Sequence, residues 1–327
     1  MILAGDIGGT NSRMALFTQE SGNLHITGEK TYPSRQYRGL EEIVNLFLAE
    51  TGAKVEAACC GIAGPVVRGR AVTANLPWVA DTTEITRQTG VAPFWLINDL
   101  HAHAAGIDGL RTADLVALNS VEAGEGNAAL IAAGTGLGEA GMYWDGRRRH
   151  AFAGEGGHAD FAPRTDVEVK LHLYLMRKFN RVSWERVLSG PGLKNIYDFL
   201  RDSGAEPEPV WLKDELDLAP DPVAVISQYG LAGKAPICER TLDIFTSAYG
   251  AEAGNLALRM LATGGVFFSG GIAGKILPKL RSRIFFDAFT DKGRMKALLE
   301  TIPLKVIINN KVGLIGAACY AMMCRET

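Results

Sequence analysis

The segment that most constrains the fold of this chain is Ala4–Arg13, where a short apolar strand meets two consecutive glycines. Gly8 and Gly9 allow a tight turn and let backbone N–H groups approach a ligand closely. Apolar residues resume at Met14–Phe17, so the segment predicts a strand, a glycine turn and a strand. A turn with clustered N–H donors can bind phosphate. An ordinary β-hairpin with a structural Asp6 explains the same residues, and the segment alone leaves both interpretations open.

The strand–turn–strand pattern occurs a second time further along the chain. Ala128–Ala133 is an apolar strand, Gly134–Gly138 is a glycine turn, and Ala140–Trp144 is again apolar. A third apolar strand, Val266–Ser269, runs into Gly270-Gly271. The first two units share a shape rather than a detectable sequence repeat. They predict two related α/β halves that face a cleft.

The other elements follow from the spacing of apolar residues. The expected strands are Ile2–Phe17 with His25–Tyr32 as a meander, Val55–Gly61, Phe94–Ile97 and Leu304–Ile308. The expected helices are Leu40–Glu50, Thr82–Thr86, Leu100–Ala105, Asp166–Phe179, Ser183–Leu188, Gly192–Asp202, Pro222–Gly230, Cys238–Leu261, Ile272–Leu280 and Leu314–Met323. Glu206–Pro222 is rich in proline and acidic residues, which predicts a connection without regular structure.

Composition excludes several classes of protein. A chain of 327 residues is long enough for two domains, and its formal net charge of -2 provides no basic field for nucleic acid or a membrane surface. The longest apolar stretches, about 8 to 10 residues, are too short to span a bilayer. Asp6 interrupts the N-terminal apolar run, which argues against a signal peptide. Five cysteines without zinc or disulfide spacing favour a reducing cytoplasm.

Asn98-Asp99 is the first candidate for catalysis, because it follows the buried apolar strand Phe94–Ile97. Ligands of α/β sheets bind beyond the carboxyl ends of the strands. A carboxylate at this position could accept a proton from a substrate hydroxyl, while the adjacent amide holds the substrate. An Asn-Asp turn that caps the next helix explains the same pair.

The glycine-rich loop around Glu155 and His158 is the second candidate. Its Glu-x-x-His spacing binds metals on helices, but the two intervening glycines disfavour a helix and therefore a metal site. A loop that presents both side chains to a polyhydroxyl ligand fits better, and an ordinary surface loop remains the alternative. Glu185 falls in the first turn of an expected helix, where the helix dipole favours a carboxylate in any case. Its function stays open at this point.

Two segments of the chain match nucleotide-binding motifs only superficially. Gly136–Gly141 reads G-x-G-x-x-G, but the chain continues extended into an Asp-Gly turn, whereas a Rossmann loop must open a helix. Gly271–Lys275 lacks the first glycine of a P-loop, and Ile276 replaces the Ser/Thr that would bind magnesium. Both motifs are rejected, although a strand that ends in Gly270-Gly271 can still approach a nucleotide closely.

Taken together, these motifs resemble the bacterial glucokinase family, which has the actin/hexokinase/Hsp70-like ATPase fold. The resemblance covers nearly the whole chain in colinear order, and its segments are Gly5–Asn11, Ile97–Asp99, Gly134–Gly138, Gly154–His158, Glu185–Gly190, Gly264–Phe267, Gly270-Gly271 and Asp291–Arg294. It implies two related α/β domains with a ribonuclease H-like motif on either side of a cleft. The small domain would comprise residues 1–109 plus about 302–327, and the large domain, with helical insertions, residues 110–301.

The resemblance also implies roles for individual residues. Asp99 would be the general base that takes the proton from the sugar 6-hydroxyl. The sugar would be bound by Asn75, Asn98, Asp99, Glu155, His158 and Glu185. ATP and its phosphates would meet Gly5, Asp6, Ile7, Gly8, Gly9, Thr10, Asn11 and Arg13 in the first turn, Gly134, Thr135, Gly136 and Gly138 in the second, and Gly270 with Gly271 near adenosine. Asp6 would lie near Mg²⁺, with water between them.

The implied activity is the ATP-dependent phosphorylation of D-glucose to glucose 6-phosphate, feeding glycolysis in the cytoplasm, by a homodimer. Leu100 replaces a phenylalanine common in the family, a packing change. Glu139 follows the second turn, where the family often has a small apolar residue; it could weaken ATP binding or point to solvent. Related sugar kinases carry a cysteine-rich zinc motif that is missing here, so no structural zinc is expected. The alternatives are a kinase of another hexose, such as mannose, fructose or glucosamine, a phosphate donor other than ATP, and a catalytically inactive sugar-binding regulator.

Overall fold

The structure is a computed structural model that describes residues 1–20, 23–73, 76–122 and 124–325. The chain divides into two compact units, each discussed separately below. Unit 1 comprises Met1–Leu115, Ala140–Ala153 and Ile307–Thr327, and unit 2 comprises Val116–Glu139 and Gly154–Val306. Within the described residues, no helix is both long enough and apolar enough to cross a membrane.

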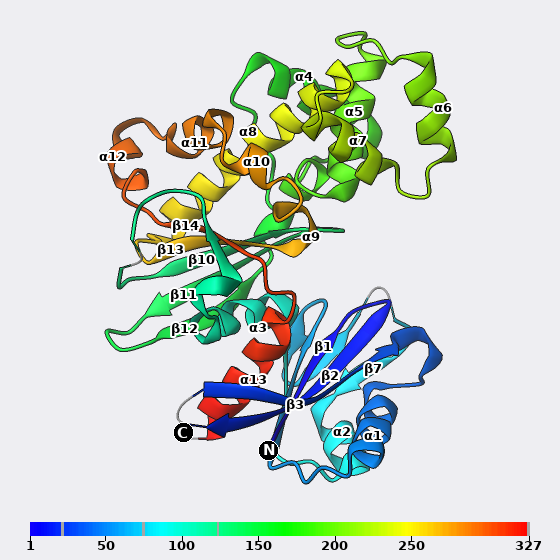
Figure 1. Ribbon diagram of the computed structural model, residues 1–327, viewed down its shortest axis with the longest axis vertical. Helices are drawn as coiled ribbons and strands as arrows, with labels where there is room; N and C mark the ends of the chain where they lie inside the picture. The colour runs from blue at the N-terminus through cyan, green and yellow to red at the C-terminus, as the bar shows by residue number, and fades with distance from the viewer. Residues whose placement is uncertain (21–22, 74–75, 123, 326–327) are drawn as a thin grey trace. The chain divides into compact units, whose positions relative to one another are not determined.

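Unit 1 is built on a five-stranded mixed sheet (Figure 1). The strand order is β3-β2-β1-β4-β8, in which β1 to β3 pair antiparallel and β1, β4 and β8 pair parallel. Its elements are β1 (Ile2–Ile7), β2 (Asn11–Glu20), β3 (Asn23–Pro33), η1 (Ser34–Gln36), α1 (Leu40–Thr51), β4 (Ala57–Ile62), β5 (Val66–Val67), β6 (Arg70–Val72), β7 (Val79–Asp81), α2 (Thr82–Thr89), β8 (Phe94–Asn98), α3 (Asp99–Gly106), η2 (Ile107–Gly109), η3 (Thr112–Asp114) and α13 (Val312–Arg325).

Unit 2 contributes most strands of a six-stranded sheet with the order β12-β11-β10-β13-β14-β9, while Ala140–Ala153, which includes most of β11 and β12, is counted in unit 1. The first five strands of this sheet repeat the order of the first sheet, since β10 is flanked by β11 and by the parallel strands β13 and β14. The remaining elements are β9 (Leu115–Ala117), β10 (Ala128–Ala133), β11 (Leu137–Trp144), β12 (Arg149–Gly154), η4 (Gly156–His158), α4 (Asp166–Phe179), η5 (Trp184–Arg186), α5 (Gly190–Asp202), α6 (Val210–Leu218), α7 (Pro222–Leu231), α8 (Pro236–Met260), β13 (Gly265–Ser269), α9 (Gly270–Ala273), α10 (Leu277–Leu280), α11 (Arg283–Thr290), η6 (Gly293–Met295), α12 (Lys296–Leu299) and β14 (Leu304–Ile307).

Alternation along β1 gives unit 1 two hydrophobic layers. Leu3 packs in one cluster with Ile43 and Phe47 of α1, whereas Ile2 packs in another cluster with Leu314 of α13. Successive side chains of a strand point to opposite faces of the sheet, so one helix layer covers each face. The sheet is therefore buried on both sides, as its nearly continuous apolar strands require.

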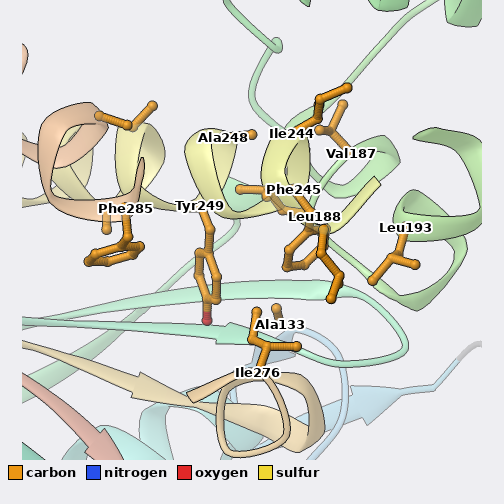
Figure 2. Packing of buried hydrophobic residues seen from close by; sticks show 14 of the residues in the cluster. Ala133, Val187, Leu188, Leu193, Ile244, Phe245, Ala248, Tyr249, Ile276 and Phe285 are labelled. Atoms are coloured by element: carbon orange, nitrogen blue, oxygen red, sulfur yellow. The ribbon is translucent and has the colours of Figure 1, made fainter. Parts of the chain in front are cut away.

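The core of unit 2 is organised around α8, a helix of 25 residues. Phe245 and Tyr249 point from α8 toward the sheet, where the Tyr249 hydroxyl is directed at the end of β10 near Ala133 (Figure 2). Both rings are fully buried, and their edge-to-face contact places the centroids 5.9 Å apart. This packing fixes α8 over the strand that leads into the second glycine turn.

Most of the expected elements are confirmed, with three exceptions in unit 2. Glu206–Pro222 contains α6, because its prolines precede and follow the helix rather than interrupt it. The helix expected over Ile272–Leu280 is broken into α9 and α10, since Pro278 cannot donate a backbone hydrogen bond to continue it. Ser183–Leu188 forms only the short η5, because the chain leaves the helical conformation at Ser189 to cap α5.

Candidate active site

The first glycine turn joins β1 to β2 and is held by Ser34 of η1. The Gly8 N–H donates to Asn11 O at 2.9 Å, and the Ser34 hydroxyl donates to Gly8 O at 2.7 Å. The Ser34 N–H donates to Thr10 O at 2.9 Å, which leaves Thr10 and Asn11 themselves exposed at the tip. Ser34 was missed in the sequence because it lies more than 20 residues from the turn that it supports.

Charged side chains gather beside this turn. Asp6 and Arg13 face each other in the register of β1 and β2, with Arg13 Nη2 3.9 Å from Asp6 Oδ2. Arg13 Nη1 also donates to Asn310 O at 2.9 Å. Burial lowers the pKa of His103, and the negative charge of Asp6 opposes that shift. The cationic guanidinium is thus fixed next to the turn, where it suits an anionic ligand.

Asn98 and Asp99 lie where β8 passes into α3. The Asn98 Oδ1 accepts hydrogen bonds from the backbone N–H groups of Leu100 and His101, and its Nδ2 donates to Gly64 O at 3.1 Å. Asn98 is therefore the N-cap of α3, so the capping interpretation is correct for this residue. Asp99 begins the helix, and its half-buried carboxylate accepts from the Leu100 N–H at 3.0 Å.

Parallel pairing brings Asp6 and Asp99 to the same edge of the sheet in unit 1. Ile7 is in register with Ile62 of β4, and Ile62 is in register with Asn98 of β8. Neighbouring strands lie about 4.8 Å apart, so the two strand ends are separated by about 10 Å. One carboxylate is thus beside the glycine turn, and the other lies two strands away at the same carboxyl edge.

The second glycine turn, in unit 2, is tied to the segment that carries Glu185. The Gly134 N–H donates to Gly136 O, and the Gly190 N–H donates to Gly134 O at 2.8 Å. Glu185 Oε2 accepts the N–H of Leu137 at 3.0 Å. A Cβ at Gly136 would lie 2.5 Å from the same oxygen, so glycine is required for this contact. Thr135 is exposed at the tip, and Gly138 follows within β11.

The loop of Glu155 and His158 is the second part of the site in unit 2. The two side chains are exposed and lie 3.7 Å apart between Oε2 and Nδ1. The Trp184 N–H donates to Ala159 O and the Phe161 N–H donates to Val182 O. This pairing places the loop next to the segment of Glu185. Unit 2 thus brings together the second turn, Glu155, His158 and Glu185.

Gly270 and Gly271 lie at the end of β13, beside β10. Gly270 has a φ of 84°, and a Cβ there would collide with the Ala133 carbonyl. Gly271 is exposed, and no heavy atom lies within 4 Å of its hypothetical Cβ. The backbone of Gly271 is therefore accessible to a flat ligand. Asn75, the remaining expected sugar-binding residue, lies outside the described residues.

The residues of the first turn fit a magnesium ion that arrives with a phosphate ligand. Mg²⁺ keeps several waters and is usually bound by one or two carboxylates plus substrate phosphates. Asp6 supplies one partly exposed carboxylate next to exposed turn residues. Across the described residues, no group of three or more His, Cys, Asp or Glu side chains could form a metal cage. One carboxylate beside a phosphate-binding turn is therefore a donor set that Mg²⁺ can use.

Comparison with known proteins decides the family. A family model described as Glucokinase matches residues 3–324. The chain belongs to the glucokinase family. It is 42% identical over 336 residues to the glucokinase of Nostoc punctiforme, with 98% of each chain covered. It is also 40% identical to the glucokinase of Synechocystis, covering 98% of this chain and 97% of that protein. It is therefore a hexose kinase, a phosphotransferase enzyme.

Solved structures agree with this assignment. The crystal structure of glucokinase from an Antarctic psychrotroph has a TM-score of 0.87 at 30% identity, covering 98% of both chains. A ROK family glucokinase from Streptomyces griseus, crystallised with glucose and AMPPNP, has a TM-score of 0.63 at 21% identity and shares the fold. The α/β fold with mixed sheets is thus that of the actin-like sugar kinases, as the motifs implied.

Proposed function

We propose that this glucokinase family member transfers the γ-phosphoryl group of ATP to the 6-hydroxyl of D-glucose. The observation that carries the proposal is the colinear set of site motifs within a family match that spans residues 3–324. The glucose and AMPPNP in the Streptomyces griseus structure support this choice of acceptor and donor. The two proposed domains are residues 1–109 plus about 302–327 and residues 110–301, with the cleft between them. Units 1 and 2 differ from this division chiefly at Ala140–Ala153, which belongs to unit 1.

Asp99 would act as the general base. As the 6-hydroxyl oxygen attacks the γ-phosphorus, Asp99 accepts the hydroxyl proton, the new O–P bond forms and the bond to the ADP oxygen breaks. Asn98 caps α3 and fixes the backbone from which Asp99 extends. A sugar offers only hydroxyls, and Asn75, Asn98, Glu155, His158 and Glu185 would supply the directional donors and acceptors that such a ligand needs.

The glycine turns would bind the phosphates. Gly5 to Asn11 and Arg13 would contact the β- and γ-phosphates, Gly134, Thr135, Gly136 and Gly138 would form the second loop, and Gly270 with Gly271 would pack near adenosine. When bound through Asp6 and water, Mg²⁺ neutralises phosphate charge. Closure around glucose would exclude water, which otherwise competes as the phosphoryl acceptor. We further propose that the enzyme works as a homodimer in the cytoplasm, feeding glycolysis.

A coupled assay across a panel of hexoses tests this function. The wild-type enzyme is incubated with ATP and Mg²⁺ plus glucose, mannose, fructose or glucosamine, and ADP formation is measured. We expect the highest kcat/KM with glucose, and glucose 6-phosphate as the product. A tenfold preference for another hexose would assign the enzyme to that sugar instead. ADP or polyphosphate in place of ATP tests the donor, and a lack of turnover with every sugar would indicate a binding protein.

A further inference from the structure

Glu139 places a buried carboxyl group directly after the second glycine turn. It is the third residue of β11, and its side chain is only 3% exposed, so the option that it points to solvent is wrong. Its carboxyl group hydrogen-bonds that of Glu252 on α8, which is fully buried. Two carboxyl groups in direct contact away from water cannot both be ionised cheaply. One of them therefore retains a proton.

The surroundings of the pair indicate which carboxyl is charged. Arg259 donates to Glu252, and Asn255 Nδ2 donates to Glu252 Oε2 at 2.8 Å. Glu139 Oε1 is buried and accepts no hydrogen bond from an N–H or O–H donor of the described residues. The cation and the amide thus stabilise Glu252 as the carboxylate, while the proton that joins the pair belongs to Glu139.

Further titratable groups face this pair from α8 and from the segment before η6. Burial raises the pKa of Tyr249, which stays an uncharged phenol. Lys292 faces Glu252, and its Nζ donates to Ala251 O at 3.0 Å. Burial lowers the pKa of Lys292, and the charge of Arg164 lowers it further. From η4, the backbone of Gly156 lies against Glu139, rather than a titratable side chain.

Glu139 also fills the space beneath the Glu155–His158 loop. A Cβ at Gly156 would collide with Glu139 Oε2, and a Cβ at Gly157 would collide with the Leu137 carbonyl. Both glycines of η4 therefore rest directly on β11, one of them on the Glu139 carboxyl group. Interiors are close-packed, so a displacement of that carboxyl group displaces the turn above it.

We propose that Glu139 is a positioning residue for glucose: its uncharged carboxyl, hydrogen-bonded to Glu252, holds η4 in the place from which Glu155 and His158 bind the sugar. Loss of its proton would put two negative charges in contact and push the carboxyl group toward η4. The inference rests on the proposed function, because it assigns glucose to the Glu155–His158 loop. The uncharged state also explains why a carboxyl group can lie so close to the second glycine turn without repelling the phosphates of ATP.

The pKa of Glu139 agrees with this assignment. Burial, and then the charge of Glu252, raise it from the ordinary 4.5 to about 8, while Arg259 opposes the shift. The uncharged form therefore predominates at neutral pH, and ionisation begins in the mildly alkaline range. Glucose binding should weaken as pH rises through this value.

The pH profile of the glucose KM tests the proposal. For the wild-type enzyme we expect the glucose KM to rise about tenfold from pH 7 to pH 9, since the sugar-binding form loses one proton near pH 8, with kcat at saturating glucose changed less than about twofold. Glu139→Gln keeps a hydrogen-bond donor to Glu252 and cannot ionise, so its glucose KM should stay flat. Glu139→Ala should raise the glucose KM at every pH, and the exposed Glu125→Gln serves as the matched control with the wild-type profile.

Two results would overturn the proposal. One is an alkaline rise in Glu139→Gln equal to that of the wild type, and the other is a wild-type glucose KM that stays flat to pH 9.5. Hydrogen exchange of residues 154–161 gives a second measurement that needs no turnover. After correction for intrinsic rates, wild-type protection of this segment should drop at least fivefold from pH 7 to pH 9, and unchanged protection would contradict the proposal even if Glu139→Gln does not fold. If the wild type phosphorylates no glucose at pH 7, the proposed function fails, whereas the exchange experiment still tests the role of Glu139.

Discussion

At the scale of single residues, Asn98 shows how one side chain can combine a structural and a positioning role. Its Oδ1 caps α3 and its Nδ2 reaches Gly64 O, so both ends of the amide are engaged within unit 1. The helix that it caps begins with Asp99. Any change in the cap therefore acts on the candidate base as well as on stability.

Asn98→Ala separates these two roles. We expect the free energy of unfolding to fall by about 1 kcal/mol through loss of the cap. We also expect kcat to fall at least tenfold, because Asp99 loses its fixed position. Asp81 caps α2 by accepting from Thr83 and Glu84, away from Asp99 in sequence, so Asp81→Ala is the matched control. Equal kcat in both variants would show that Asn98 is a cap and nothing more.

The positions of some of these residues could be predicted from the sequence, and those of others could not. The place of Asp99 at the carboxyl edge of the sheet could be predicted, because it follows a short apolar strand and α/β ligands bind beyond the ends of such strands. Ser34 could not, since its contact with Gly8 depends on the path of β3 and η1. Glu139 was misjudged for the same reason: its contact with Glu252 is made across more than 100 residues of chain.

At the scale of elements, α3 and α13 pack closely in unit 1 (Figure 1). A Cβ at Gly316 would collide with the Ala102 carbonyl, and a Cβ at Gly106 would collide with the Val312 carbonyl. Glycines at both positions let the two helix backbones touch. This contact places the start of α13 next to Asp6, since a Cβ at Gly313 would lie 3.3 Å from the Asp6 carboxyl carbon.

Gly316→Ala should therefore destabilise the protein even though alanine favours helices. We expect a loss of about 1–3 kcal/mol in the free energy of unfolding, the usual cost of overpacking. Gly274→Ala is the control, because no heavy atom lies within 4 Å of its hypothetical Cβ and its φ of -64° suits alanine. That control should change stability by less than about 1 kcal/mol. A stabilised Gly316→Ala variant in urea unfolding would refute the close packing of α3 and α13.

Elements were predicted best where the apolar pattern was long and local. The bounds expected for α4 are those observed, whereas Ser183–Leu188 forms only η5 because the chain turns extended at Ser189 to cap α5.

At the scale of the whole molecule, the two sheets have matching strand orders, and each carries a glycine turn between its central strand and the next. The repeated strand–turn–strand pattern predicted this relation correctly. The burial of the Glu139 and Glu252 carboxyl groups could not be predicted in the same way, because it depends on how α8 covers the second sheet.

Glu139 should make stability fall as pH rises. Its folded-state pKa of about 8 lies above the ordinary 4.5, so the folded chain keeps a proton that the unfolded chain releases. The stabilisation that this retained proton gives the folded state is complete below pH 4.5. It is lost progressively up to pH 8, by at most about 1.4 kcal/mol per pH unit. In urea unfolding at pH 5 to 9, the free energy of unfolding of Glu139→Gln should increase relative to that of the wild type up to pH 8, and the difference should stay constant above pH 8. A constant difference over that range would mean that Glu139 is ionised in the folded protein.

The most direct test of the account is Asp99→Asn, in which the amide keeps the shape of the side chain but cannot accept the proton. Glucose affinity, measured by calorimetry without turnover, should stay within about fivefold of the wild type. The kcat for glucose phosphorylation should fall by about 10²–10⁴-fold, the usual contribution of a general base. The exposed Asp108→Asn, in the same unit, is the control and should keep wild-type kcat. Turnover of Asp99→Asn within tenfold of the wild type would show that Asp99 is not the catalytic base.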